Sequence, residues 1–442
     1  MKLPILKGFD EEAFNKYLKN TGWLMFGRIG SMAIKMLTSI QVANFLLPNN
    51  NGLFNTSTSY IYLFAALASL GLDSFIVKEL HQFPKKRDTI LGTSFILKTS
   101  AGLLCLPLIY LSWLFFPLSD IPYLFILILS FTGIFQSLTI IDSYFQSEVK
   151  SKYIMQVQIV SNILSAGIKL LLIFFFKAEL IYFIYAYVFD ILLVSIGYLA
   201  VYSKRGLSIF KWNYDKELAK KLLNLSWPLI ISGIMVSVYM KIDVIMLKEI
   251  LGEEGAAASG SYATVVMFSE ALNFVPVVIV SSLFPAILNA RRDDPERYKK
   301  RLQNLFDLMV WLSLTFAIFI SLASPIIYKF FKPEFASAAP VLAVHVWGSL
   351  FVFLGVASSQ FLITEGYSKL TFTRTGFGAI INIALNFLLI PKMGMMGTAI
   401  ATVIAYFSAT FLILFIPKTR PQGIMMLKSL FLVSAFQKIF KR

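Results

Sequence analysis

The sequence is poor in charged residues and has almost no cysteine or histidine. Only 14% of its 442 residues are charged and 57% are hydrophobic, whereas an average soluble domain is about 25% charged. So few polar residues cannot cover the surface of a soluble chain of this length. One cysteine, Cys105, excludes an intrachain disulfide, and two histidines leave little for a metal site. The composition excludes a cytosolic enzyme, a nucleic-acid-binding protein and a secreted disulfide scaffold.

The sequence also lacks the features of a catalyst. It contains no GxxxxGK[ST] loop, so we expect no ATP hydrolysis by this chain. The connections on the expected outer side are short and leave no room for a soluble catalytic domain. A membrane-embedded polymerase or ligase, which can also have many spans, would carry a large outer loop rich in Arg or His. We therefore predict that the protein is not an enzyme and needs no resident cofactor.

Long apolar runs dominate what is present. A membrane-crossing helix needs about 20 mostly apolar residues. The pattern predicts an all-α polytopic protein with about twelve such spans. We place them at 20–46, 52–77, 89–116, 122–146, 153–176, 179–202, 222–250, 260–290, 302–331, 339–365, 369–391 and 393–416.

Lys and Arg predict the orientation of these spans. Of the 40 basic residues, 30 fall on the two tails and the even-numbered connections, and five fall on the opposite side. Basic residues collect on the cytoplasmic side of membrane proteins. The bias therefore predicts that both termini are cytoplasmic and accounts for much of the net charge of +16. No small-residue cleavage site follows the first span, so we do not expect a removable signal peptide.

Short motifs indicate that the two halves are related. Asn20-Thr-Gly-Trp23 opens the first span and Asn224-Leu-Ser-Trp227 opens the seventh. Gly52 begins a similar motif on the second span, and Gly260 does so on the eighth. Six spans separate the copies, which predicts two six-helix lobes related by a pseudo-two-fold axis along the membrane normal. We expect lobes at 1–205 and 206–420 and an amphipathic cytoplasmic tail at 421–442.

Basic residues inside the spans are the first functional candidates, because an embedded charge is costly. The five are Arg28, Lys35, Lys98, Lys169 and Lys241. Arg28 and Lys35 are seven residues apart and share one helix face, which Ser31 and Thr38 continue. One interpretation is a cavity that binds an anionic substrate. The alternative is snorkelling or interhelical ion pairs, for example between Lys98 and Asp190.

The second half carries embedded acids. Asp243 is two residues from Lys241, so the two side chains should point to different sides of their helix. Glu270, with Asn273 one turn on, fits either a proton or cation site or a hydrogen-bonded packing position. Asp307 is expected to be a structural cap or ion-pair partner.

Several stretches resemble the polysaccharide flippases of the O-antigen (Wzx) type, a branch of the multidrug/oligosaccharidyl-lipid/polysaccharide exporter (MOP) superfamily. The matching stretches are Asn20-Thr-Gly-Trp23 through Gly27-Arg28-Ile-Gly30, Leu46-Leu-Pro48 followed by Gly52-Leu-Phe, Ser69-Leu-Gly-Leu-Asp73, and Asn382-Ile-Ala-Leu-Asn386-Phe-Leu-Leu-Ile-Pro391 running through Gly394 and Gly397 to Thr402. Together they extend over essentially the whole chain.

The resemblance implies a function and its partners. It implies a flippase that moves undecaprenyl-pyrophosphate-linked oligosaccharides by alternating access, for O-antigen (lipopolysaccharide), capsule or exopolysaccharide synthesis. Expected partners are this lipid-linked substrate, membrane lipids, and polysaccharide polymerase and glycosyltransferases, with no nucleic acid. The location would be a bacterial or archaeal cytoplasmic membrane. The alternative is a multidrug/cation antiporter of the same superfamily, which should prefer an acidic cavity.

The resemblance also implies a site for coupling to Na⁺ or H⁺. Some related lipid flippases bind sodium in the second lobe. The positions that match theirs are Asp243, Asn382, Asn386 and Thr402, and Glu270 is a further candidate. Asn386 stands where those relatives have an acid, so the site has lost one negative charge. The alternative is an asparagine pair that joins helices by hydrogen bonds.

Overall fold

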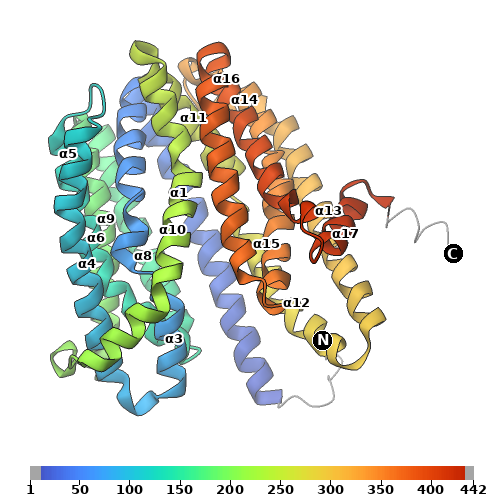
Figure 1. Ribbon diagram of the computed structural model, residues 1–442. Coiled ribbons are helices and arrows are strands. Elements are labelled where there is room, and N and C mark those ends of the chain that lie inside the picture. Colours follow the sequence, from blue (N-terminus) through green and yellow to red (C-terminus); the bar gives the residue numbers. More distant parts are fainter. Residues whose placement is uncertain (1–10, 434–442) are drawn as a thin grey trace. The chain divides into compact units, whose positions relative to one another are not determined.

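The protein is built from α-helices. The computed structural model describes residues 11–433, and over that range the chain forms helices, turns and short 3₁₀ segments, without a β-strand (Figure 1). Ten helical runs in the described range are long and apolar enough to cross a membrane. The all-α, multi-pass architecture predicted from composition is thus confirmed.

Seven helices within residues 11–433 have at least 24 residues. They are α1 (Glu11–Tyr62), α4 (Arg87–Phe115), α8 (Ser151–Phe174), α9 (Leu180–Lys204), α10 (Lys216–Ile250), α13 (Pro295–Ile327) and α16 (Ser368–Phe411). Shorter helices in succession form the other three runs. These are α5 (Tyr123–Ser130), α6 (Thr132–Phe135) and α7 (Ile140–Ser147); α11 (Gly255–Ser269) and α12 (Phe274–Asp293); and α14 (Ala338–His345) and α15 (Gly348–Thr364). The short helices α2 (Ala65–Ser69) and α3 (Asp73–Gln82) follow α1, and α17 (Arg420–Leu430) follows the last span.

Two of the long helices, α1 and α16, each extend from one predicted span into the next and are broken between the two. The backbone of α1 is non-helical at Leu47, which precedes Pro48. A residue before proline avoids the α conformation, and proline lacks the N–H that would continue the helix. The backbone of α16 is non-helical at Gly394, with φ +53°. Counting the arms of α1 and α16 separately turns ten runs into the twelve expected spans.

The arms of α16 fold back on each other. In a straight helix, Asn382 and Thr402 would lie about 30 Å apart. Instead the Asn382 amide nitrogen lies 3.5 Å from the Thr402 hydroxyl oxygen. The reversal needs Gly394, because its backbone conformation is rare for other residues. Gly397 allows the close approach, since a Cβ there would overlap the Leu389 carbonyl oxygen.

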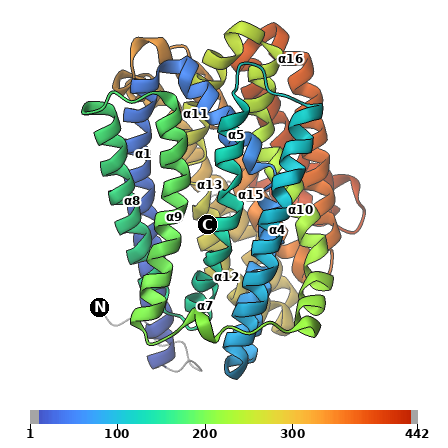
Figure 2. The ribbon, with the colours of Figure 1, turned by 90° about the vertical axis from the view of Figure 1, so that its left-hand side faces the viewer.

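The chain forms two compact units. The first contains residues 1–45 and 60–234, of which 11–45 and 60–234 are described. Its core is an apolar cluster drawn from α3, α4, α7, α8, α9 and α10. Within this unit α8 and α9 lie side by side (Figure 2). The break between α2 and α3 places Leu70 and Gly71 at positive φ, and this break starts α3 at Asp73.

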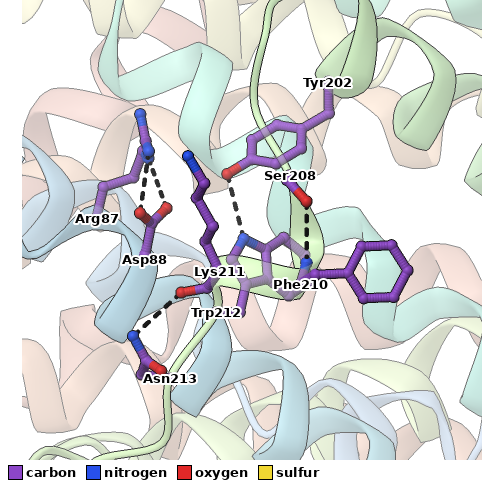
Figure 3. A network of polar contacts seen from close by, with 8 residues as sticks. All are labelled: Arg87, Asp88, Tyr202, Ser208, Phe210, Lys211, Trp212 and Asn213. Atoms are coloured by element: carbon purple, nitrogen blue, oxygen red, sulfur yellow. Dashed lines mark hydrogen bonds and ion pairs between the residues drawn. The ribbon is translucent and has the colours of Figure 1, made fainter.

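The segment 205–215, which joins α9 to α10, is fixed to the first unit. The Trp212 indole nitrogen donates to the Tyr202 hydroxyl at 3.1 Å (Figure 3). The Asn213 backbone nitrogen donates to the Asp88 carbonyl at 3.3 Å. The connection is therefore an ordered part of this unit.

The second unit contains residues 46–59 and 235–442, described as far as residue 433. Its core is an apolar cluster from α12, α13, α15 and the helices that follow. The α17 helix packs on α13, where the Gln303 amide donates to the Met425 carbonyl at 3.0 Å and to the Ser429 hydroxyl at 2.7 Å. Residues 434–442 of the predicted amphipathic tail lie outside the described residues.

A close backbone contact holds residues 46–59 in the second unit. A Cβ on Gly52 would overlap the Ala256 carbonyl oxygen, and a Cβ on Gly260 would overlap the Pro48 carbonyl oxygen. The Asn51 amide also donates to the Gly260 carbonyl at 2.7 Å. The two glycines that the repeat motif pairs are thus partners in one contact between helices.

The compact units differ from the predicted lobes in the residues that they contain. Residues 46–59 group with the second unit, and residues 206–234 group with the first. Helices α1 and α10 each contribute residues to both units. The repeat boundary at 205 and the membrane-surface role of the tail stay predictions.

Candidate substrate and cation sites

Arg28 and Lys35 lie on one side of α1. Seven residues separate them, which is about 10.5 Å along a helix axis. Both are exposed, while the hydroxyl residues Ser31 and Thr38 on the flank of this stripe are buried. Among the described residues, neither Arg28 nor Lys35 has an ion-pair partner. They are open cations on a span, and they share one side of the helix as the spacing predicted.

Lys98 on α4 is paired. Its ammonium forms an ion pair with Asp73 and lies 3.4 Å from the Thr139 hydroxyl. Its side chain is only 3% exposed, whereas that of Asp73 is 60% exposed. The ion pair at Lys98 agrees with the alternative interpretation, in which embedded basic residues form interhelical ion pairs. The predicted partner, Asp190, was wrong. The break before α3 brings Asp73 to Lys98, and the sequence alone does not reveal that break.

We call Arg28, Lys98, Asp73 and Asp142 the Arg28 group. Asp142 on α7 interacts electrostatically with the other three members. Two cations and two carboxylates make this group balanced in charge. Asp142 also accepts a hydrogen bond from the Gln146 amide at 3.0 Å.

We call Lys35, Lys169 and Asp190 the Lys35 group. Lys169 on α8 pairs with Asp190 on α9 at 2.5 Å, and both side chains are mostly buried. This pair, rather than snorkelling, accounts for Lys169. Lys35 interacts electrostatically with both partners. With two cations and one carboxylate, the group keeps one positive charge.

Lys241 belongs with the acids of the second unit. It is half-buried on α10 and interacts electrostatically with Glu270. The Tyr406 hydroxyl donates to Glu270 at 3.4 Å, so Glu270 has a hydrogen-bonded position at the end of α11. Both interpretations of Glu270 remain compatible with these contacts.

Asp243, Asn382, Asn386 and Thr402, which we call the Asp243 cluster, come together in the second unit. The Asp243 carboxylate accepts from the Asn386 amide at 2.7 Å and from the Thr402 hydroxyl at 2.5 Å. Asn386 also donates to the Asn382 side-chain oxygen at 3.1 Å. All four side chains are buried. The reversal of α16 creates the cluster by bringing Thr402 back to the asparagine pair.

The Asp243 cluster offers side-chain oxygens that can coordinate a cation, and one of its four side chains is a carboxylate. Asn386 Oδ1 is buried and accepts no hydrogen bond within the described residues, which is unusual for a buried polar atom. Oxygen donors suit hard cations such as Na⁺. A single carboxylate matches one positive charge. The residues therefore fit a monovalent cation or a proton.

Two residues of the second unit were missed by sequence reasoning. Tyr262 lies at the Asp243 cluster, and its hydroxyl donates to Asp243 at 3.3 Å. Its place after Gly260 in the repeat motif was an available signal. Arg374 lies near the start of the predicted span 369–391 but was not among the embedded candidates. It is buried on α16 and donates to the hydroxyls of Ser358 at 3.0 Å and Ser359 at 2.6 Å. In the sequence, its position at the predicted cytoplasmic end of that span is typical of a loop cation.

Solved structures share this fold. A multidrug resistance transporter of the MATE family and MOP superfamily, in an inward-facing conformation, is 16% identical with a TM-score of 0.68, over 92% of this chain and 96% of that one. The lipid II flippase MurJ, in an inward closed conformation, is 17% identical with a TM-score of 0.68, over 96% and 93%. A MOP superfamily transporter from Pyrococcus furiosus is 16% identical with a TM-score of 0.66, over 93% and 96%. At these identities the likeness shows the fold.

Family models identify the chain. The long apolar helices make this a multi-pass membrane protein, and its family models together with its structural neighbours are those of MOP-superfamily transporters and flippases, not of enzymes. The model for polysaccharide biosynthesis proteins matches residues 17–291, more than half of the chain, so the chain belongs to that family. The MatE model matches residues 228–388. The superfamily expected from the sequence is thereby confirmed.

One curated relative is an uncharacterized membrane protein, MJ1068, from Methanocaldococcus jannaschii. It is 35% identical over 82 residues, which is 19% of this chain and 16% of the relative. The match spans less than a fifth of that relative's length, so it carries no argument about activity.

Proposed function

We propose that the protein is a flippase for oligosaccharides that are linked through a pyrophosphate to a polyprenyl lipid carrier, undecaprenyl. The observation that carries this proposal is the pair of open cations, Arg28 and Lys35, on one face of α1. Exposed charges within a span are expensive in lipid and belong beside water or a charged ligand. A pyrophosphate supplies acidic oxygens, which arginine and lysine bind through charge-assisted hydrogen bonds.

The two charge groups give the headgroup successive positions along α1. The Arg28 group lies nearer the predicted cytoplasmic end, and the Lys35 group lies deeper and keeps a positive charge. We infer that the pyrophosphate first meets Arg28 and then Lys35. The polyprenyl tail would stay in lipid, while one lobe rocks against the other in alternating access.

The Asp243 cluster is the proposed coupling site. Asp243, Asn382, Asn386 and Thr402 would hold Na⁺ through their side-chain oxygens, with Asp243 balancing its charge. A proton on Asp243 is the alternative occupant. When bound, the cation would favour one of the transporter's conformations over the other and so link transport to an ion gradient. Asn386 Oδ1 has no hydrogen bond in the described residues, so this oxygen would gain its missing interaction by coordinating the cation.

The setting follows from the same proposal. A flippase for this substrate works in a bacterial or archaeal cytoplasmic membrane with both termini in the cytoplasm. Glycosyltransferases that build the oligosaccharide would supply it, and a polysaccharide polymerase would use it on the outer leaflet. O-antigen, capsule and exopolysaccharide synthesis all need this step.

A leaflet assay tests the flippase. In host cells that lack this gene and other flippases, a membrane-impermeant glycan probe on spheroplasts should find the lipid-linked oligosaccharide absent from the outer leaflet. Wild type should restore labelling, and Arg28→Ala/Lys35→Ala should not. Lys150→Ala is the matched control, because Lys150 forms only an exposed ion pair with Glu148. Wild-type labelling by the double variant, at equal expression, would contradict the assignment.

A second function has one observation in its favour. The MatE match over residues 228–388 and the MATE-like fold support a multidrug/cation antiporter. Three carboxylates in the first unit, Asp73, Asp142 and Asp190, could contact a cationic drug. If gene loss leaves the oligosaccharide distribution unchanged but sensitises cells to cationic drugs, the antiporter replaces the flippase.

A further inference from the structure

We propose that Asp73 is an internal competitor of the substrate, occupying Lys98 until an anionic headgroup displaces it. The inference rests on the proposed function and deepens it. It makes Asp73 a residue that sets the specificity of the Arg28 group without itself binding the headgroup.

The two partners of this ion pair differ in their surroundings. The Lys98 side chain is buried, while more than half of the Asp73 side chain is exposed. A buried ammonium needs an anion beside it, because an unpaired buried charge is strongly unfavourable. An exposed carboxylate can be solvated after it leaves. Displacement of Asp73 by an anionic headgroup therefore costs little free energy for the solvated Asp73 carboxylate, and Lys98 keeps an anion beside it.

The backbone explains how Asp73 reaches Lys98 and how it could leave. Asp73 is the first residue of α3, directly after a break with Leu70 and Gly71 at positive φ. A Cβ on Gly71 would meet the Leu229 side chain at 2.9 Å, so packing within the first unit holds the break in place. Only the side chain of Asp73 has to rotate for the exchange.

Lys98 has a second donor beside it. Ser94 precedes it by one turn of α4, and the Ser94 hydroxyl is buried with no hydrogen-bond partner in the described part of the chain. The Asp73 carboxylate pairs with Lys98 but accepts no hydrogen bond from the Ser94 hydroxyl. A phosphate group has more acceptor oxygens and could engage both side chains. The exchange therefore favours a phosphate over a carboxylate.

Binding of inorganic pyrophosphate to the purified full-length protein, measured by titration calorimetry, tests the inference. Asp73→Asn removes the competing charge and should tighten binding about tenfold, within the range of coupling between contacting residues. Asp73→Glu keeps the charge and should bind like wild type. The gain should vanish in Asp73→Asn/Lys98→Met. Glu148→Gln, which removes a charge from an exposed ion pair of the same unit, should change nothing.

The outcomes separate this inference from the proposed function. If wild type binds pyrophosphate through Arg28 and Lys35 but Asp73→Asn does not tighten binding, the inference alone is overturned. If neither wild type nor Asp73→Asn binds, both are overturned. Should Asp73→Asn fail to fold, Asp73→Ser provides the same comparison, because serine also removes the competing charge and is smaller than aspartate. Binding by Asp73→Asn with none by wild type would support the inference most directly.

Discussion

The Asn386 amide donates a hydrogen bond of 2.7 Å to the Asp243 carboxylate, although 143 positions separate the two residues in the chain. The bond joins α16 to α10 inside the second unit. It leaves Asn386 Oδ1 without a hydrogen bond in the described residues, one atom away from the donating nitrogen. Rotation of the amide by half a turn would exchange the two atoms. The same residue can therefore stabilise the carboxylate directly or, after rotation, offer an oxygen to a bound cation.

The first prediction concerns that cation. Na⁺ should raise the melting temperature of the purified protein relative to choline at equal ionic strength, because a ligand that binds only the folded state stabilises it. Asp243→Asn should abolish this rise, since it removes the only carboxylate of the Asp243 cluster. Differential scanning fluorimetry over a Na⁺ series measures both effects.

Asn386→Asp is the matched variant for this prediction. It adds a second carboxylate at the same position and should shift the Na⁺ response to lower concentrations. A Na⁺-dependent rise of equal size in Asp243→Asn and wild type would show that sodium acts elsewhere. In that case the Asp243 cluster is a helix-joining network.

The second prediction concerns the Lys169–Asp190 pair. Lys169→Ala should destabilise the protein, because it leaves the mostly buried Asp190 carboxylate without its partner. A double-mutant cycle with Asp190→Ala should give a coupling free energy of about 0.5–3 kcal/mol. The Lys150–Glu148 pair, which is exposed, should give less than about 1 kcal/mol. Equal coupling in the two cycles would contradict the structural role assigned to Lys169.

The third prediction concerns Arg374. Its guanidinium bonds two hydroxyls and the Gly355 carbonyl, all on α15. Lysine has a single terminal nitrogen and cannot reproduce this fork. Arg374→Lys should lower the free energy of unfolding by about 1–3 kcal/mol, the cost of leaving buried polar groups unpaired. Lys369→Arg on the exposed face of the same helix is the control and should leave the melting temperature nearly unchanged.

Most of the fold could be predicted from the sequence because a bilayer restricts the alternatives. Every backbone polar group in lipid must be paired internally, so an apolar run of sufficient length becomes a helix. That argument placed the spans. It could not show the backbone torsions at Leu47 and Gly394 by which α1 and α16 break between successive spans. Nor could it show that residues 46–59 pack with the second unit, which depends on contacts between distant segments.

Some residues of the candidate sites could be predicted from the sequence and others could not, because contacts between distant segments place the latter. Arg28 and Lys35 follow from helical spacing alone, since both lie on one helix. Lys98 and Lys169 were recognised as embedded charges, but their partners depend on a helix break and on the packing of α8 against α9. The Asp243 cluster came from resemblance rather than from spacing, and Tyr262 was missed because an aromatic residue in a span is usually a packing residue.

The last prediction concerns the backbone contact between α1 and α11. Gly52→Ala and Gly260→Ala each place a Cβ against a carbonyl oxygen of the other helix, and a backbone atom cannot move aside as a flexible side chain can. Each variant should lose several degrees of melting temperature or fail to accumulate. Gly30→Ala on α1 is the control, since a Cβ there meets nothing within 4 Å. Alanine favours a helix over glycine by up to about 1 kcal/mol, so this control should be neutral or stabilising. If Gly52→Ala behaves like Gly30→Ala, the contact is not close in the protein, and residues 46–59 are not fixed to the second unit in this way.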